Sequence, residues 1–129
     1  MNQQLALATL VVDDYDRAIA WYTQVLGFEL RQDVAIGTGK RWVVVAPAGS
    51  HAGLVLTQAS TVNQQSRVGD QTGGRVGFFL HTDDFARDHA AMLGRGVRFT
   101  EAPRQEPHGT VAIFTDLYGN TWDLLEPAP

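Results

Sequence analysis

The feature that most constrains the fold is a capped amphipathic helix that occurs twice, about seventy positions apart. In the first copy Asp14 precedes an apolar stripe at helical spacing, and Gly27 ends it. In the second copy Asp83-Asp84-Phe85 repeats Asp13-Asp14-Tyr15, and Gly96 marks the stop. An aspartate before the first turn accepts hydrogen bonds from its unpaired N–H groups, and glycine adopts the left-handed conformation in which helices end. The repeat predicts two related modules.

Segments with strand character surround each predicted helix. One short apolar run precedes the helix, and three runs separated by clusters of turn residues follow it. The expected strands cover residues 5–12, 28–34, 41–46 and 53–58 in the first copy, and 75–82, 97–100, 110–115 and 120–125 in the second. The order is β-α-β-β-β twice over, which predicts an α+β protein.

The length of the chain bounds its organisation. A chain of 129 residues is long enough for one domain with a sizeable core. We therefore expect a single domain over residues 1–129, with module one at about 5–58, a linker at 59–74 and module two at about 75–126. The linker is polar and lacks periodicity, so it is either a solvated connection or a loop that closes over a binding site.

Charge and hydropathy exclude several classes of partner. The net charge is −4, and no run of basic residues offers the electrostatic footprint of a nucleic-acid-binding protein. No apolar run approaches the roughly 20 residues needed to span a bilayer, and the polar start does not resemble a signal peptide. We therefore expect a cytoplasmic protein without nucleic-acid or membrane partners. The absence of cysteine rules out disulfides and thiolate metal sites.

Three motifs carry a resemblance to a known family. They are Asp14-x-x-Arg17 leading to Tyr22, the run Val25-Leu26-Gly27-Phe28, and the closing Phe114-x-Asp116-x-x-Gly119-Asn120. Together with the tandem pattern they resemble the vicinal oxygen chelate superfamily, the group of glyoxalase I, extradiol dioxygenases, fosfomycin-resistance enzymes and bleomycin-binding proteins. The resemblance implies that each module curls its mixed sheet into a concave half-barrel with the helix outside. It further implies a pocket enclosed by both modules and, as in most small members, a homodimer.

The resemblance also allows the metal site to be tested. Metal-dependent members hold a divalent cation through His, Gln or Glu on the first and fourth strands of each module. The aligned positions here are Leu7, Val55, Gly77 and Asp123. Only Asp123 can bind a metal, whereas a protein site needs at least three ligands. We therefore expect no cofactor, and a divalent metal is disfavoured.

Strand alternation predicts which other side chains face the pocket: Thr9 on the first strand, and Phe79 and His81 on its counterpart. The imidazole of His81 could bind a ligand or move a proton. The alternative is a surface histidine beside the helix cap. Asp123 would be a carboxylate in an apolar cavity, where burial makes it a candidate base. Otherwise it pairs with Arg41 or Arg104.

Cations and aromatic residues complete the candidate site. Arg41-Trp42 could grip an anionic or aromatic ligand, or could be an edge arginine beside a packed tryptophan. Arg104 and His108 lie in the expected loop 103–109, at the predicted pocket mouth or simply in solvent. The predicted catalytic residues are Asp123 and His81, and the predicted ligand-binding residues are Thr9, Arg41, Trp42, Val55, Phe79, His81, Arg104, His108 and Asp123.

These observations favour a small-molecule-binding protein that lacks the usual metal ligands and sequesters an aromatic or antibiotic-like ligand. The alternative is a glyoxalase-like lyase or isomerase, or a dioxygenase, which either is metal-dependent or uses Asp123 and His81. A third interpretation is a dimeric module with a vestigial pocket whose partner is another protein.

Overall fold

The computed structural model describes residues 2–129, which form two compact units. The first unit ends at Val68 and the second covers Gly69–Pro129. The division lies within the 59–74 segment that we expected to connect the modules. The single-domain organisation stays a prediction, and each unit is described by itself below.

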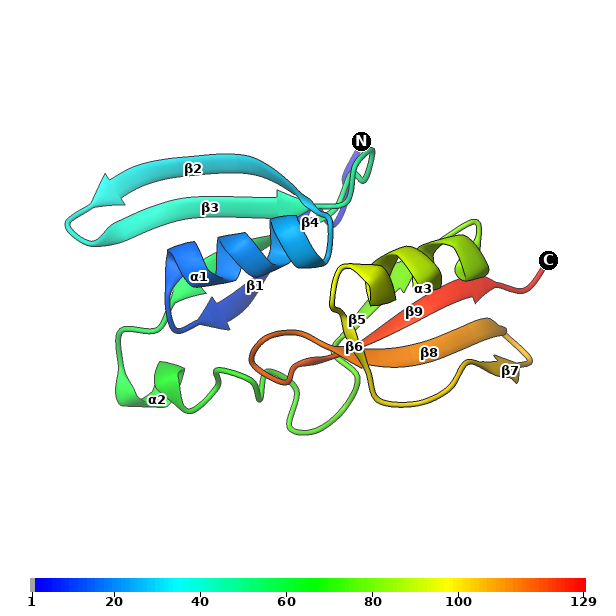
Figure 1. Ribbon diagram of the computed structural model, residues 1–129. Helices are drawn as coiled ribbons and strands as arrows, with labels where there is room; N and C mark the ends of the chain where they lie inside the picture. The colour runs from blue at the N-terminus through cyan, green and yellow to red at the C-terminus, as the bar shows by residue number, and fades with distance from the viewer. Residues whose placement is uncertain (1) are drawn as a thin grey trace. The chain divides into compact units, whose positions relative to one another are not determined.

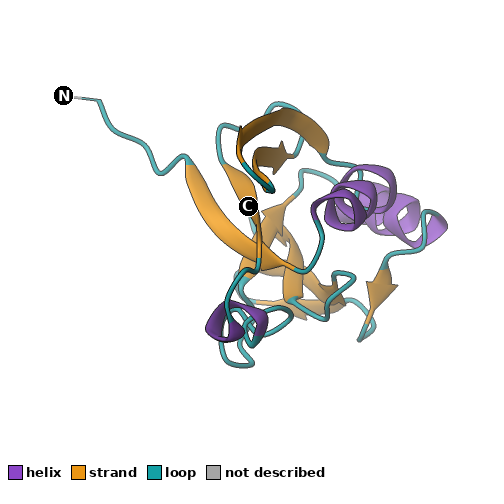
Figure 2. Cartoon of the chain, turned by 90° about the vertical axis from the view of Figure 1, so that its left-hand side faces the viewer, coloured by secondary structure: helices purple, strands orange, loops and turns teal. Residues whose placement is uncertain are grey.

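The first unit is a four-stranded mixed sheet with a helix over one face (Figure 1). The strand order is β1-β4-β3-β2; β1 pairs with β4 in parallel, and the other pairs are antiparallel. Residues 2–6 form no regular element before the first strand (Figure 2). The elements are β1 (Leu7–Val12), α1 (Tyr15–Ala20), the π-helical turn η1 (Trp21–Val25), β2 (Glu29–Gly37), β3 (Lys40–Ala46), β4 (Gly53–Gln58) and the short helix α2 (Val62–Gln65).

Local chemistry explains the first helix. The Asp14 carboxylate accepts a hydrogen bond from the Arg17 backbone N–H at 2.9 Å, which caps α1 as the sequence predicts. The helix ends where Gly27 adopts a φ of 90°, a conformation that glycine enters at little cost. Ala18 of α1 and Tyr22 of η1 are fully buried together with residues of the sheet, namely Leu10, Val12, Val43, Val45 and Leu56.

The second unit repeats this plan. Its sheet has the order β5-β9-β8-β6, with β7 also pairing with β8, and α3 lies over one face (Figure 1). The pair β5–β9 is parallel, and the remaining pairs are antiparallel. The elements are β5 (Phe78–His81), α3 (Phe85–Gly94), β6 (Arg98–Phe99), β7 (Arg104–Glu106), β8 (Gly109–Thr115) and β9 (Thr121–Pro127).

A continuous row of aromatic rings joins α3 to its sheet. Neighbouring ring centroids are 4.5–5.7 Å apart, within the range of favourable aromatic contacts. His89 lies between two phenylalanines in this row, as expected of a structural histidine on the packed stripe of the helix. The row runs through Phe85, His89, Phe99, Phe114, Trp122 and Phe78.

Each unit contains an equivalent hydrogen bond from its helix to its last strand, which the sequence repeat does not reveal. In the first unit the side-chain oxygen of Gln58, at the end of β4, accepts a hydrogen bond from the Tyr15 N–H at 3.3 Å. In the second unit Glu126, near the end of β9, accepts one from the Phe85 N–H at 2.8 Å. Each final strand therefore holds the first turn of its own helix.

Some element boundaries differ from expectation. Residues 104–106 form strand β7 inside the expected loop 103–109, because they pair with β8. The 59–74 segment contains the short helix α2, which Thr61 caps. None of the helices within residues 2–129 is long and apolar enough to cross a membrane.

Candidate functional site

In the second unit, the sheet face opposite α3 carries several predicted site residues. Phe78 packs against Trp122 on the helix side, so strand alternation directs Phe79 and His81 to the other face. Phe79 keeps 60% of its surface exposed. Asp123 is the register partner of Phe79 on β5 and of Ile113 on β8, which places it beside Phe79 on this face.

Asp123 is the most unusual side chain of this face. Only 7% of the residue is accessible, and its Oδ1 atom is buried without a hydrogen-bond partner among residues 2–129. Burial raises the pKa of the Asp123 carboxyl; Glu101 adds to the increase, whereas Arg104 and His108 oppose it. A buried acceptor without a partner is costly, which makes Asp123 a candidate for binding a donor from outside the chain.

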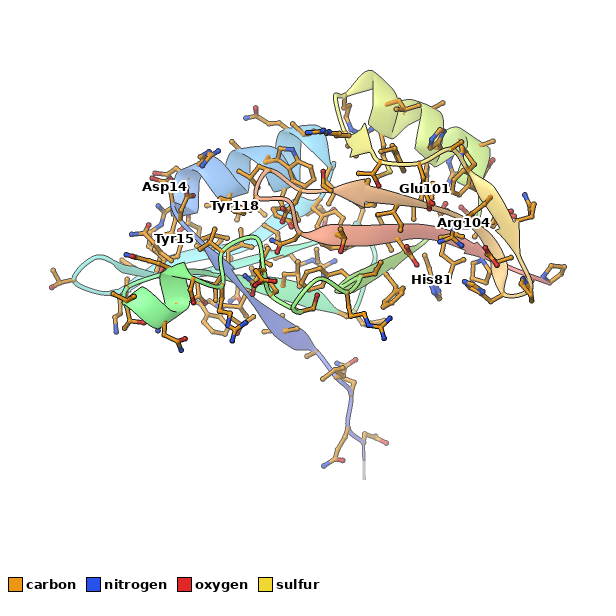
Figure 3. The ribbon with its side chains drawn as sticks, turned by 90° about the horizontal axis from the view of Figure 1, so that it is seen from below. Asp14, Tyr15, His81, Glu101, Arg104 and Tyr118 are labelled. Carbon is orange, nitrogen blue, oxygen red and sulfur yellow. The ribbon has the colours of Figure 1, made fainter. Side chains whose placement is uncertain are left out.

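Arg104 is engaged by other carboxylates (Figure 3). Its guanidinium donates to Glu106 at 2.6 Å and to Glu101 at 3.1 Å. Glu101 also accepts the backbone N–H of Ile113 at 3.0 Å, which fixes the cluster to strand β8. The pairing of Asp123 with an arginine, one of the alternatives weighed from the sequence, does not occur with Arg104 in residues 2–129.

The candidates of the first unit also have structural partners. Arg41 donates to Asp33 at 2.7 and 3.0 Å and to Asp16 at 2.9 Å. The Trp42 indole N–H donates to the side chain of Gln32 at 2.8 Å. A role of Arg41 or Trp42 in ligand binding stays a prediction.

The remaining candidates fall on the two units as follows. Thr9 and Val55 are register partners on β1 and β4 of the first unit; Thr9 is exposed and Val55 is buried. His81 is exposed at the end of β5, and His108 is exposed between β7 and β8. The predicted site therefore consists of two groups, one on each unit, and its assembly into one site stays a prediction.

The residues do not fit a metal centre of the kind the resemblance implies. Of the four aligned positions, Leu7, Val55 and Gly77 offer no side-chain ligand. Within residues 2–129, moreover, no group of three or more His, Cys, Asp or Glu side chains is arranged to hold an ion. Asp123 alone, the one carboxylate at the four aligned positions, falls short of the three protein ligands that such sites use.

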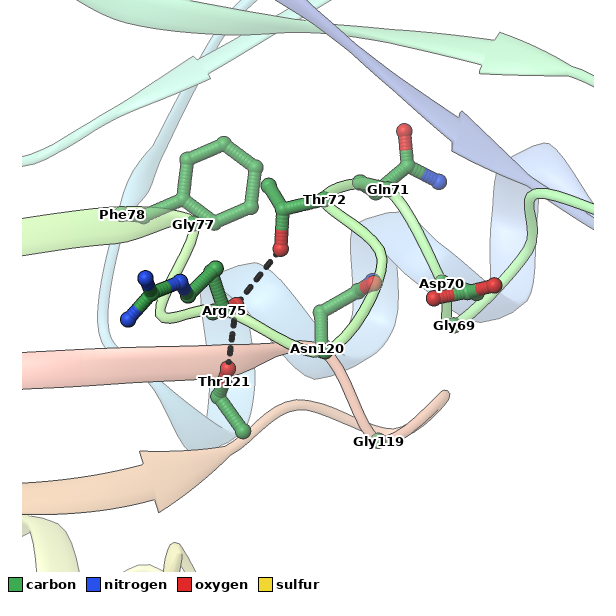
Figure 4. A pocket seen from close by; sticks show the side chains of 11 residues that line it. Gly69, Asp70, Gln71, Thr72, Arg75, Gly77, Phe78, Gly119, Asn120 and Thr121 are labelled. Atoms are coloured by element: carbon green, nitrogen blue, oxygen red, sulfur yellow. Dashed lines mark hydrogen bonds between the residues drawn. The ribbon is translucent and has the colours of Figure 1, made fainter.

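A second feature of the second unit is a small cavity that the sequence did not indicate (Figure 4). It has a volume of about 70 Å³, room for a few water molecules, and lies between residues 69–78 and 119–121. The hydroxyls of Thr72 and Thr121 both donate to the carbonyl of Arg75, at 2.5 and 3.0 Å. Gly69 lines this cavity, and its φ of 79° and its close approach to the Tyr118 carbonyl exclude a side chain at this position.

Comparisons with known proteins give a consistent picture. The sequence model of the glyoxalase/bleomycin resistance protein/dioxygenase superfamily matches residues 4–124. An uncharacterized protein of Shewanella frigidimarina (strain NCIMB 400) is 48% identical over 128 residues, covering 98% of this chain and 95% of the relative.

Solved structures agree with the sequence match. UcmS2 superposes with a TM-score of 0.83 at 30% identity, covering 98% of this chain and 99% of that one. TnmS3, an antibiotic binding protein from Streptomyces sp. CB03234, gives a TM-score of 0.78 at 31% identity, with 98% of both chains covered. The expected α+β fold and the family resemblance are confirmed. The chain belongs to the glyoxalase/bleomycin resistance protein/dioxygenase superfamily.

Proposed function

We propose that this protein binds a small aromatic or antibiotic-like molecule and holds it without a metal ion. The observation that carries the proposal is the sheet face of the second unit opposite α3, where the exposed ring of Phe79 adjoins a carboxyl oxygen of Asp123 that has no hydrogen-bond partner within residues 2–129. Small-molecule sites combine apolar surface with a few polar groups that orient the ligand, and this face has both. The similarity to TnmS3, an antibiotic binding protein, supports the same class of ligand.

The test is a binding titration of the purified protein with a panel of aromatic antibiotics, in which the fluorescence of its three tryptophans reports binding. We expect Phe79→Ala to weaken binding at least about tenfold, because it removes the exposed aromatic surface. The matched control is Val62→Ala, which truncates a side chain that is 84% exposed on α2. Equal affinities of the two variants, or no binding by the whole panel, would contradict the proposal.

A second candidate function is metal-independent proton transfer, by a lyase or isomerase that uses Asp123 as base and His81 as its partner. The observation that favours it is the raised pKa of Asp123, whose cause is burial. Asp123→Asn should then abolish turnover while the circular dichroism spectrum stays unchanged. Normal turnover by this variant would exclude Asp123 as the base.

We also propose that the protein acts as a homodimer in the cytoplasm. The dimer rests on the family resemblance. Light scattering coupled to size-exclusion chromatography should give twice the 14.1 kDa of one chain. A single-chain mass at micromolar concentration would refute the dimer, and cell fractionation tests the location.

A further inference from the structure

We propose that Asp123 is the anchor for a protonated amine, so that the ligand of this face is an aromatic molecule that carries a cationic nitrogen. The inference rests on the proposed function and names the chemical class of its ligand. It depends on three features of the second unit: a carboxyl oxygen without a hydrogen-bond partner in the part of the chain that the structure describes, an excess of negative charge, and an exposed aromatic ring beside them.

The Asp123 carboxyl group has no hydrogen-bond partner for its Oδ1 atom within residues 2–129, and 7% of the residue stays accessible. Arg104 lies close enough to act on Asp123 electrostatically. Its guanidinium nevertheless donates its hydrogen bonds to Glu101 and Glu106. The Asp123 residue is more than nine-tenths buried, and its Oδ1 has no hydrogen-bond partner within the described residues. Asp123 can thus accept a hydrogen bond from a donor group of a ligand.

The charges around Asp123 select the sign of that donor. Three carboxyl groups, of Asp123, Glu101 and Glu106, lie near two groups that can carry a positive charge, Arg104 and His108. The local charge is therefore negative when all three are ionised, and an anionic ligand would meet repulsion. A protonated amine would instead supply the counter-charge that Arg104 does not, through a charge-assisted hydrogen bond.

The third feature, the exposed ring of Phe79, indicates that the ligand is aromatic. Phe79 is the register partner of Asp123 on the adjacent strand, and 60% of its surface is exposed. A flat ring can stack on Phe79 while its amine reaches the carboxyl, and the aromatic face also attracts a cation directly. Ile113, on the other side of Asp123, adds apolar surface. The combination favours an aromatic amine over an aliphatic one.

The experiment compares three probes that share one ring system and differ in charge: 1-naphthylmethylamine, 1-naphthylmethanol and 1-naphthoate. Dissociation constants are measured by calorimetry at pH 7 for the full-length protein. We expect the amine to bind at least about tenfold more tightly than the alcohol, because a charge-assisted bond replaces a neutral one, and naphthoate to bind most weakly.

Two variants locate the effect. Asp123→Asn should remove the preference for the amine and change the affinity for the alcohol by less than about threefold. The matched control is Asp83→Asn, which removes the same charge from an exposed pair with Arg87 on the same unit. It should leave the preference intact, since screened surface charges act weakly at a distance.

The outcomes separate this inference from the proposed function. Binding of the alcohol without a preference for the amine overturns the cationic ligand and leaves the small-molecule site standing. A preference that survives Asp123→Asn overturns Asp123 as the anchor. If none of the three naphthalene probes binds to wild type, the aromatic amine is overturned as the ligand class, and the titration with the antibiotic panel decides the proposed function separately.

Discussion

Replacing Asp123 by asparagine should make the protein more stable at neutral pH, although the residue is buried. The side chains have nearly the same shape, so the substitution avoids the strain of overpacking and chiefly removes a charge. Leaving a buried acceptor unsatisfied costs about 1–3 kcal/mol, and more when the group is charged. Because the asparagine amide keeps part of this cost, we expect a gain of about 1 kcal/mol in the free energy of unfolding.

The pH dependence gives the prediction its sharpest form. Burial raises the pKa of Asp123 in the folded protein above its value in the unfolded chain, which is about 3.9. Below that pH both states are protonated, and charge makes no difference between wild type and variant. As pH rises, the unfolded chain loses its proton first, which favours unfolding of the wild type. The advantage of the variant should therefore grow from pH 3 to pH 7.

Urea denaturation followed by tryptophan fluorescence at a series of pH values measures this difference. Asp83→Asn serves as the control, because its exposed pair with Arg87 should contribute about 0–1 kcal/mol. The reasoning is refuted if Asp123→Asn destabilises the protein at pH 7, or if its advantage is the same at pH 3 and pH 7. The first result would mean that Asp123 has a stabilising partner, and the second would mean that its charge does not cause the difference.

Further predictions concern hydrogen bonds and glycines of the two units. Arg41→Gln should lower stability by about 1 kcal/mol at pH 7, because Arg41 binds Asp33 through two hydrogen bonds. Arg41 holds the pKa of Asp33 below its usual value, so urea titrations should show this loss fading as pH falls below about 4. Gly109→Ala should cost several-fold more stability in thermal melts than Gly39→Ala, since an added Cβ at Gly109 overlaps a backbone carbonyl of β9, whereas Gly39 has nothing within 4 Å; equal costs would contradict this account. Glu126→Ala should destabilise helix α3 by about 1 kcal/mol and Glu126→Gln much less, because glutamine keeps the oxygen that accepts from the helix; hydrogen exchange in the first turn distinguishes the two.

The parts of the fold that sequence reasoning predicted are those whose causes are local. A capping aspartate and a terminal glycine act within one turn, so Asp14 and Gly27 located the first helix correctly. Strand alternation likewise separated Phe78, on the helix side, from Phe79 on the open face. The strand β7 was missed because Arg104-Gln105-Glu106 has no apolar alternation, and its pairing with β8 creates the strand.

The candidate site was harder to predict because its chemistry depends on partners that are distant in sequence. Arg41 donates hydrogen bonds to Asp33 and Asp16, and its own strand does not indicate these partners. Asp123 was expected either in an apolar cavity or beside an arginine. Only the structure shows that the nearby Arg104 is engaged by two glutamates. Such competition between carboxylates for one cation leaves no trace in a single sequence.

The bonds from Gln58 and Glu126 to the helices have a consequence for synthesis of the chain. Each joins residues more than forty positions apart, with the helix made first and its acceptor last. On the ribosome, the first turn of α1 emerges long before Gln58, and the first turn of α3 long before Glu126. Each of these two hydrogen bonds can therefore form only after the end of the unit's own final strand has been synthesised, so the first unit can make its bond while the second is still being translated.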